Sequence, residues 1–314
     1  MLNCFMRSIP EPFVDADNAR PTPAVTVVIP TLGGDCLSAT IEALNRGSVV
    51  PAEILICVPA ERAHKVDLSW PNVKVLATEC RGQVAQRAVG FRNASHAFVM
   101  QLDDDLIVGQ DCLKYLLDSL QHHGSRAAVS PSLIDAVTGE SIYKRPNRNK
   151  VIEALYNRVM NGSAGYQQGR IQKSGGAVGV DPQLEKRDSY HVEWLPGGCV
   201  LHHKANLMLD DFYPFKGKAY CEDIIHSHYL TSRGVTPIIE PRALCGIEPA
   251  SDAAYTVGEF LRDVVADYDA RRYFMRLTAR HSFRLYLFVL ARCLSYINGR
   301  LMKAMRRPEA LKTR

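Results

Sequence analysis

The run Ala97-Phe98-Val99-Met100-Gln101-Leu102-Asp103-Asp104-Asp105 decides how this sequence is interpreted. Its apolar part predicts a short buried strand, and the strand ends directly in three carboxylates. Carboxylates this close repel one another, so they are most easily kept ionised when a divalent cation or several hydrogen-bond donors face them. At the carboxyl end of a strand in an α/β sheet, such residues typically hold Mg²⁺ or Mn²⁺ that bridges a diphosphate. A solvated turn or a helix cap is the alternative interpretation.

On both sides of this run, apolar segments alternate with helical patterns. Strands are predicted at residues 25–30, 53–58, 73–77 and 127–133, and helices at residues 37–44, 83–91 and 111–123. This alternation is typical of a parallel-type sheet that is covered by helices on both faces. We therefore expect a Rossmann-like, nucleotide-binding layout over residues 24–133.

The second half of the chain is less regular. Residues 161–191 are rich in glycine and lose periodicity, which predicts a long mobile loop that is either a lid or a surface insertion. Gly197 and Gly198 then form a turn before another apolar strand. Farther along, Glu222 and Asp223 open a helix, where they act either as a cap or as a functional pair.

Composition excludes several classes of protein. With 314 residues and 46% hydrophobic content, the chain can bury a substantial core. Nine cysteines are scattered without metal-type spacing, which favours a reducing cytosol. Residues 1–23 lack the apolar core of a signal peptide, and we interpret them as a leader arm. No long uncharged apolar run predicts a membrane-spanning helix.

The C-terminal residues carry a charge that the net value of +5 conceals. Residues 270–314 contain twelve Lys and Arg side chains against one acid, Glu309. Arg276, Arg280 and Arg284 recur at every fourth position beside apolar residues, which predicts a basic amphipathic helix. Such a helix suits an anionic membrane surface, and the alternatives are packing against the rest of the protein or an oligomer contact. No nucleic-acid recognition motif accompanies the charge.

Several ordered motifs together resemble the family 2 glycosyltransferases. They are Val28–Thr31, the segment from Arg81 through Arg87 to Gly90, Leu102–Asp105, Pro196–Cys199 and Glu222–Asp223. The resemblance covers roughly residues 24–245. It implies a GT-A fold, a nucleotide-diphosphate sugar donor, a divalent cation and usually inversion at the anomeric carbon.

The resemblance also implies roles for individual residues on the donor side. The expected nucleotide-sugar site consists of Pro30, Thr31, Arg81, Gln83, Arg87, Asp103 and Asp104. Arginine side chains suit such a site because their planar forks match diphosphate oxygens. Asp105, together with Asp103, matches the carboxylates that bind Mg²⁺ or Mn²⁺.

On the acceptor side, the resemblance places Trp194, Gly197 and Gly198 at the acceptor site. Asp223 matches the general base of the family. For Glu222 three roles stay open, which are orienting Asp223, contacting the acceptor or capping the helix. A positioned carboxylate can take the proton of the attacking hydroxyl, and this effect is typically worth about 10²–10⁴-fold in rate.

The sequence departs from the family pattern at two places. After the second strand, Val58–Arg62 stand where the family usually has aspartates that contact the nucleobase. Glu61 or Arg62 therefore becomes the candidate contact with the base. A donor other than a uridine nucleotide is also left open. Ala88 replaces an asparagine that often follows the arginine here. His226 lies one turn after Asp223, and we interpret it as a structural helix histidine in preference to a metal ligand.

These observations define one expectation and its rivals. We expect a leader arm at residues 1–23, a catalytic domain at 24–249 with halves 24–133 and 134–249, and a basic helical tail at 250–314. The predicted enzyme is an inverting hexosyltransferase that builds a bacterial surface glycan or glycolipid, peripheral at the inner face of the membrane, with oligomerisation through the tail left open. One rival is a sugar-nucleotide nucleotidyltransferase, although residues 30–35 lack its Gly-rich loop ending in basic residues. The other is a non-catalytic nucleotide-sugar or membrane-binding subunit, against which Asp105 and Asp223 argue.

Overall fold

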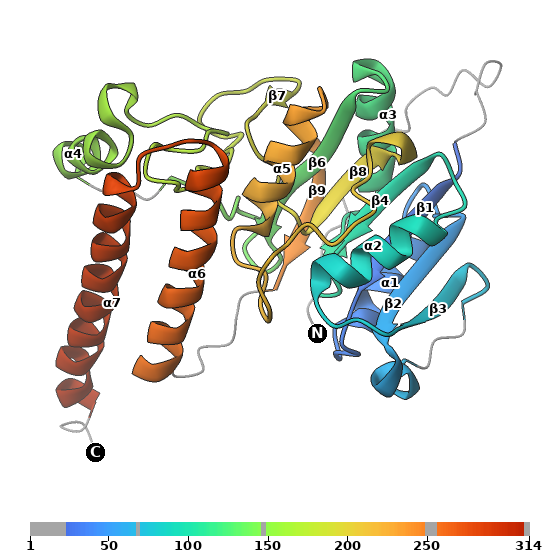
Figure 1. The fold of residues 1–314 in the computed structure, drawn as a ribbon, viewed down its shortest axis with the longest axis horizontal. Helices are drawn as coiled ribbons and strands as arrows, with labels where there is room; N and C mark the ends of the chain where they lie inside the picture. The colour runs from blue at the N-terminus through green and yellow to red at the C-terminus, as the bar shows by residue number, and fades with distance from the viewer. Residues whose placement is uncertain (1–22, 67–69, 146–148, 249–255, 311–314) are drawn as a thin grey trace, which may run out of the picture.

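The computed structural model describes residues 23–66, 70–145, 149–248 and 256–310, with side chains up to residue 300 (Figure 1). The predicted leader arm thus lies almost wholly outside the described residues. The strands are β1 (Val25–Pro30), β2 (Glu53–Pro59), β3 (Val73–Thr78), β4 (Phe98–Leu102), β5 (Leu106–Val108), β6 (Ala127–Asp135), β7 (Tyr190–His191), β8 (Cys199–His203) and β9 (Thr236–Ile247). They form one mixed sheet in the order β3-β2-β1-β4-β8-β6-β9-β5, with β7 paired to β9.

Helices cover both faces of this sheet. They are α1 (Leu37–Asn45), α2 (Gln83–Asn93), α3 (Cys112–His123), α4 (Lys150–Asn161), α5 (Glu222–Ser232), α6 (Val257–Leu277) and α7 (Phe283–Ala310), with short 3₁₀ turns at Ala60–Lys65, Gly162–Ala164 and Lys204–Asn206. Side chains of α1 and α3 share a buried cluster with Val27 and Ile29, whereas α2 packs with Val28 on the opposite face. The predicted α/β layout is therefore confirmed.

Close packing between α2 and β1 depends on one glycine. A Cβ at Gly90 would lie 2.3 Å from the Val28 side chain, so α2 rests directly on the strand. The buried Gln86 amide of the same helix donates to the carbonyl oxygens of Thr31 and Cys57, at 2.8 and 2.7 Å. Together these contacts hold α2 against the carboxyl ends of β1 and β2.

The sheet also brings the motifs of both halves of the chain together. β1 and β4 are parallel neighbours, so their carboxyl ends lie at one edge of the sheet. β8 runs antiparallel to β4 and pairs Cys199 with Leu102. As a result the turn that precedes β8 lies beside the three aspartates, and the Asp103 amide donates to the Gly198 carbonyl at 2.8 Å.

The segment at residues 161–191 is largely irregular, as the sequence predicts. It is not detached from the protein, because Ile171, Ser174 and Val180 are buried. An isolated bridge joins Ile171 to Ala177 and closes a small loop within the segment. Its function as a mobile lid stays a prediction.

The basic tail folds as the helical hairpin of α6 and α7, which packs against α5 and α4 at one end of the molecule (Figure 1). The expected stripe of Arg276, Arg280 and Arg284 along one helix is wrong, because the chain turns between α6 and α7 and Ala279 adopts a left-handed φ of 51°. Arg280 donates to the Ile171 carbonyl at 3.2 Å, and Arg284 donates to carbonyls at the end of α4. These contacts favour the alternative in which the tail packs on the rest of the protein.

A bilayer-crossing helix requires a long stretch of apolar residues. Among the described residues, no helix combines that length with that apolar content.

Candidate active site

A buried arginine joins the two halves of the candidate site. The Arg87 guanidinium donates to Glu222 Oε1 at 2.9 Å and to Asp103 Oδ1 at 3.1 Å. The side chains of Arg87 and Glu222 are only 3% and 6% exposed, so this ion pair lies in a region of low dielectric. Burial raises the pKa of Asp103 to about 6, although the Arg87 charge opposes that shift. Arg87 therefore fixes the start of α5 against the end of β4.

The other predicted donor-side residues surround the aspartates at the same edge. Thr31, which follows the buried Pro30, donates its hydroxyl to the Asp104 carboxylate. Gln83 Nε2 donates to Asp103 Oδ1 at 2.5 Å. The structure thus brings these residues together as the sequence predicts.

Arg81 lies at the exposed rim of this group. Its guanidinium forms a salt bridge of 2.5 Å with Glu61, one of the residues that stand in place of the family's nucleobase-contacting aspartates. Arg62 Nη1 donates to the Leu32 carbonyl at 3.3 Å, which ties the end of β2 to the loop after β1. The departure from the family pattern therefore forms a small polar edge beside the predicted donor site.

Two carboxylates are the candidate metal ligands. Asp105 is exposed, whereas Asp103 is partly buried and shares one of its oxygens with Arg87 and Gln83. Within the part of the chain that the structure describes, no group of three or more His, Cys, Asp or Glu side chains gathers to hold an ion. This donor set fits a hard cation such as Mg²⁺, which protein usually binds through one or two carboxylates while substrate phosphates and water complete the shell.

The glycine turn before β8 makes room for carboxylates. A Cβ at Gly197 would lie 2.8 Å from Glu222 Oε2, and a Cβ at Gly198 would lie 3.2 Å from Asp103 Oδ2. Both glycines line a cleft of about 390 Å³ that Asp103 and Asp223 also line. The close approach that these glycines allow is therefore between their backbone and the protein's own carboxylates. Their predicted contact with the acceptor stays a prediction.

Asp223 lies at the start of α5 and lines this cleft. Burial raises its pKa to about 6, the Glu222 charge adds to the increase, and Arg271 opposes it. Cys221, the residue before Glu222, has φ 55° and ψ 17°. This left-handed backbone conformation is unfavourable for residues other than glycine. The backbone therefore holds the Glu222–Asp223 pair at a sharp entry into the helix.

Two further residues of the cleft come from the tail, and sequence reasoning assigned neither of them to a site. Arg271 and Asp267 lie one turn apart on α6, and Arg271 Nε donates to both Asp267 oxygens at 3.0–3.1 Å. Asp267 also accepts the Cys221 thiol at 3.3 Å. The sequence indicates this pair only through its spacing, because an acidic and a basic residue stand four positions apart at the start of the basic region.

The comparisons with known proteins follow this geometry. Residues 58–173 match the sequence model of glycosyl transferase family 2. The match covers 116 of the 314 residues, and this part of the chain is similar to the family 2 glycosyltransferases. No curated protein sequence matches the chain.

One solved structure shares the fold of this chain at a TM-score above 0.5. The chain is similar to GalNAc-T7, solved with UDP, GalNAc and Mn²⁺, at 19% identity and a TM-score of 0.54, covering 82% of this chain and 50% of that one. It also matches S. aureus TarS 1–349 in complex with UDP-GlcNAc, at 14% identity and a TM-score of 0.46, covering 79% and 64%. The chain thus spans about half the length of the GalNAc-T7 chain. The expected GT-A fold is confirmed.

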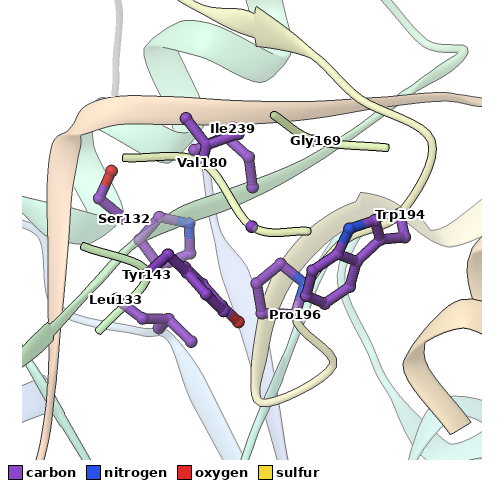
Figure 2. Close-up of a pocket in the computed structure, with 10 residues that line it drawn as sticks. Ser132, Leu133, Tyr143, Gly169, Val180, Trp194, Pro196 and Ile239 are labelled. Carbon is purple, nitrogen blue, oxygen red and sulfur yellow. The ribbon is translucent and has the colours of Figure 1, made fainter. Parts of the chain in front are cut away.

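Trp194, the predicted acceptor contact, does not line the cleft that holds Asp103 and Asp223. It is buried, and its indole Nε1 donates to the Val178 carbonyl at 3.0 Å. Figure 2 shows its ring beside Pro196 and across from Tyr143 in a small apolar pocket. The Trp194 and Tyr143 rings meet edge to face, with centroids 5.9 Å apart. A direct acceptor contact by Trp194 stays a prediction. The buried ring is placed to support the segments that surround the cleft.

His226 is a buried core residue. Its ring stacks on Phe212 at a centroid distance of 5.5 Å and an interplanar angle of 10°. Burial lowers its pKa to about 3, and the Arg87 charge adds to the decrease, so the imidazole is neutral at physiological pH. This packing agrees with the structural interpretation of His226.

Proposed function

We propose that the protein transfers a sugar from a nucleotide-diphosphate donor to an acceptor hydroxyl, with inversion at the anomeric carbon and with Asp223 as general base. The observation that carries this proposal is the convergence of Asp103 and Asp223 on one cleft. A donor whose diphosphate lies near Asp103 and Asp105 would present its anomeric carbon toward Asp223. A hydroxyl activated by Asp223 would then attack from the side opposite the leaving diphosphate, which inverts the configuration.

The raised pKa of Asp223 suits the role of a base. At a pKa of about 6, the carboxyl group is mostly ionised at pH 7 and is more basic than an ordinary aspartate. Glu222 supplies part of the increase, and its own charge is held by Arg87. We therefore propose that Glu222 and Arg87 are positioning residues that set the basicity of Asp223 and the geometry of the cleft.

Departure of the nucleoside diphosphate requires stabilisation of negative charge. Asp103 and Asp105 would hold Mg²⁺ or Mn²⁺, which supplies positive charge to the phosphates when bound. Arg81 and Gln83 lie at the start of α2, where backbone N–H groups and the helix dipole also favour anions. The GalNAc-T7 structure with UDP and Mn²⁺ supports a nucleotide sugar and a divalent cation as ligands of this chain.

We further propose that the acceptor is a bacterial surface glycan or glycolipid and that the protein contacts the membrane peripherally. One face of α7 supports this contact, because its apolar side chains are half or more exposed at three- and four-residue spacing; they are Phe283, Tyr286, Leu290, Leu294 and Ile297. Cosedimentation with anionic and neutral vesicles tests it. We expect the protein to sediment with anionic vesicles and not with neutral ones, and we expect the double substitution Leu290→Glu/Leu294→Glu to abolish this binding. Recovery of the wild-type protein in the supernatant with both kinds of vesicle would refute the membrane contact.

A thermal-shift panel tests the activity itself. The full-length protein is heated with UDP-, GDP-, TDP- and CMP-sugars, each with Mn²⁺ or with EDTA, since a ligand that binds only the folded state raises the melting temperature. We expect one nucleotide to stabilise the protein in a metal-dependent way, and release of that nucleoside diphosphate on adding an acceptor. Absence of any donor-dependent shift and of any release would refute the proposal.

A further inference from the structure

A second cavity adjoins the cleft on the side of α4 and the tail. Its volume is about 380 Å³, which lies within the range of small-molecule sites. Ala177 and Arg271 line both this cavity and the cleft that holds Asp223, so the two spaces are neighbours. The cavity is walled by three tyrosines and one phenylalanine, and we call it the tyrosine cavity; the rings are those of Tyr143, Tyr156, Tyr166 and Phe288.

We infer that the tyrosine cavity is an acceptor subsite that binds an uncharged sugar unit of a glycan chain next to the unit whose hydroxyl reacts at Asp223. This inference rests on the proposed function, because it assigns the acceptor to the same site. Aromatic rings offer flat apolar faces for the C–H faces of a sugar ring. Asn157 and Gln172 also line the cavity; Gln172 Nε2 donates to Asn157 Oδ1 at 3.4 Å and Asn157 Nδ2 donates to the Glu153 carbonyl at 2.9 Å, and the remaining amide N–H groups and the Gln172 oxygen can meet sugar hydroxyls.

The charges around the tyrosine cavity favour a neutral occupant. Two arginines line it, and both are already paired. Arg145 forms an ion pair with Glu153 and stacks over the Tyr166 ring at 4.5 Å. Arg271 is paired with Asp267, also contacts the Gly175 carbonyl, and lies 4.7 Å from the centre of the Phe288 ring. A phosphate or carboxylate would therefore find no unpaired cation among the described lining residues.

The tyrosine cavity opens beside the cleft that Asp223 lines, because Ala177 and Arg271 line both spaces. A glycan that enters the tyrosine cavity past Ala177 would therefore deliver its next sugar unit to Asp223. The tail takes part directly, because α6 provides Arg271 and α7 provides Phe288.

The tryptophans allow a direct test. The chain has two, and Trp70 lies on the surface at 38% exposure, so Trp70→Phe leaves Trp194 as a single reporter. Trp194 donates to the Val178 carbonyl, and Val178 lines the tyrosine cavity. Fluorescence of this variant would be titrated with maltotriose, cellotriose, chitotriose and mannotriose. A saturable change with at least one of these trisaccharides is expected, and no saturable change with any of them would overturn the inference.

Two matched variants locate the binding. Tyr156→Ala, in the cavity wall at 36% exposure, is expected to weaken binding of the trisaccharide about tenfold, which corresponds to the loss of an aromatic contact worth about 1.4 kcal/mol. Tyr115→Ala removes a partly buried tyrosine of α3 that does not line the cavity, and affinity should stay unchanged. Equal affinity of Tyr156→Ala and wild type would overturn the inference.

Donor binding is measured on the same samples by the thermal shift with Mn²⁺. A donor shift without trisaccharide binding would refute the subsite and leave the proposed transferase intact. Trisaccharide binding without any donor shift would instead refute the proposed function.

Discussion

Removal of Arg87 should destabilise the protein far more than removal of a surface arginine. In Arg87→Gln, the Glu222 carboxylate loses its ion-pair partner at 6% exposure, and Asp103 loses one at 26% exposure. Breaking a buried pair by removing one partner costs about 3–5 kcal/mol, because the other charge remains buried. We assign this loss in the free energy of unfolding to the Arg87–Glu222 pair alone, since solvent reaches Asp103 and weakens the contribution of the Arg87–Asp103 pair.

The matched control is Arg46→Gln, which breaks the Arg46–Glu42 pair of α1. That pair has a shorter distance, 2.5 Å against 2.9 Å, but its side chains are 76% and 45% exposed. Exposed pairs at this spacing contribute about 0.3–0.5 kcal/mol. The structure therefore predicts that Arg87→Gln lowers the free energy of unfolding roughly ten times as much as Arg46→Gln. The difference in burial, and not the difference in ion-pair distance, causes this ratio.

Urea unfolding followed by circular dichroism in EDTA measures both changes. Arg87→Gln/Glu222→Gln should recover a large part of the loss, because the double variant leaves one buried charge fewer. The loss of stability should also shrink as the pH falls from 8 to 5, since Asp103, whose pKa burial raises to about 6, becomes protonated and no longer needs the charge of Arg87. A loss below about 1 kcal/mol for Arg87→Gln, or a double variant less stable than the single one, would refute the argument from burial.

Three further predictions concern the cleft. Asp223→Asn should slow sugar transfer by about 10²–10⁴-fold while the donor-induced thermal shift persists, and undiminished transfer would remove Asp223 as the base. Because the base must be ionised, the wild-type rate should rise as the pH increases through about 6 and then level off. In Arg271→Met the inflection should move to higher pH, since the arginine lowers the Asp223 pKa, and an unmoved inflection would contradict this contribution. Gly197→Ala should lower the melting temperature and the rate, because its Cβ would lie 2.8 Å from Glu222 Oε2, whereas Gly258→Ala, whose Cβ meets nothing within 4 Å, should not.

Local patterns were sufficient to predict the elements that build the donor side of the fold. β1, β2 and β4 are short apolar runs with turn signals at their ends, and each forms where the sequence places it. The strand that ends in Asp103 needs no distant information, because its burial and its carboxylates lie in one continuous segment. The edge of the sheet then brings Thr31 and Asp104 together through the parallel pairing of β1 with β4.

The contacts between distant parts of the chain could not be predicted in this way. Arg87 and Glu222 are 135 residues apart, and the family resemblance suggested phosphates as the arginine's partners where the structure has carboxylates. The tail was misjudged for a related reason. Periodicity showed that Arg276, Arg280 and Arg284 share a spacing, but the turn at Ala279 that separates them is a tertiary feature without a glycine or proline to mark it.

α6 and α7 enter the wall beside the cleft, so the two recognition tasks that we propose would be divided along the chain. Asp103 and Asp104 are fixed by β1, β4 and α2, whereas Arg271 and Phe288 come from helices that follow the sheet. Substitutions in the hairpin can therefore remodel one half of the site while the other half keeps its geometry. If the proposed sites hold, natural selection or protein engineering can change the acceptor specificity through the hairpin while the donor site keeps its residues.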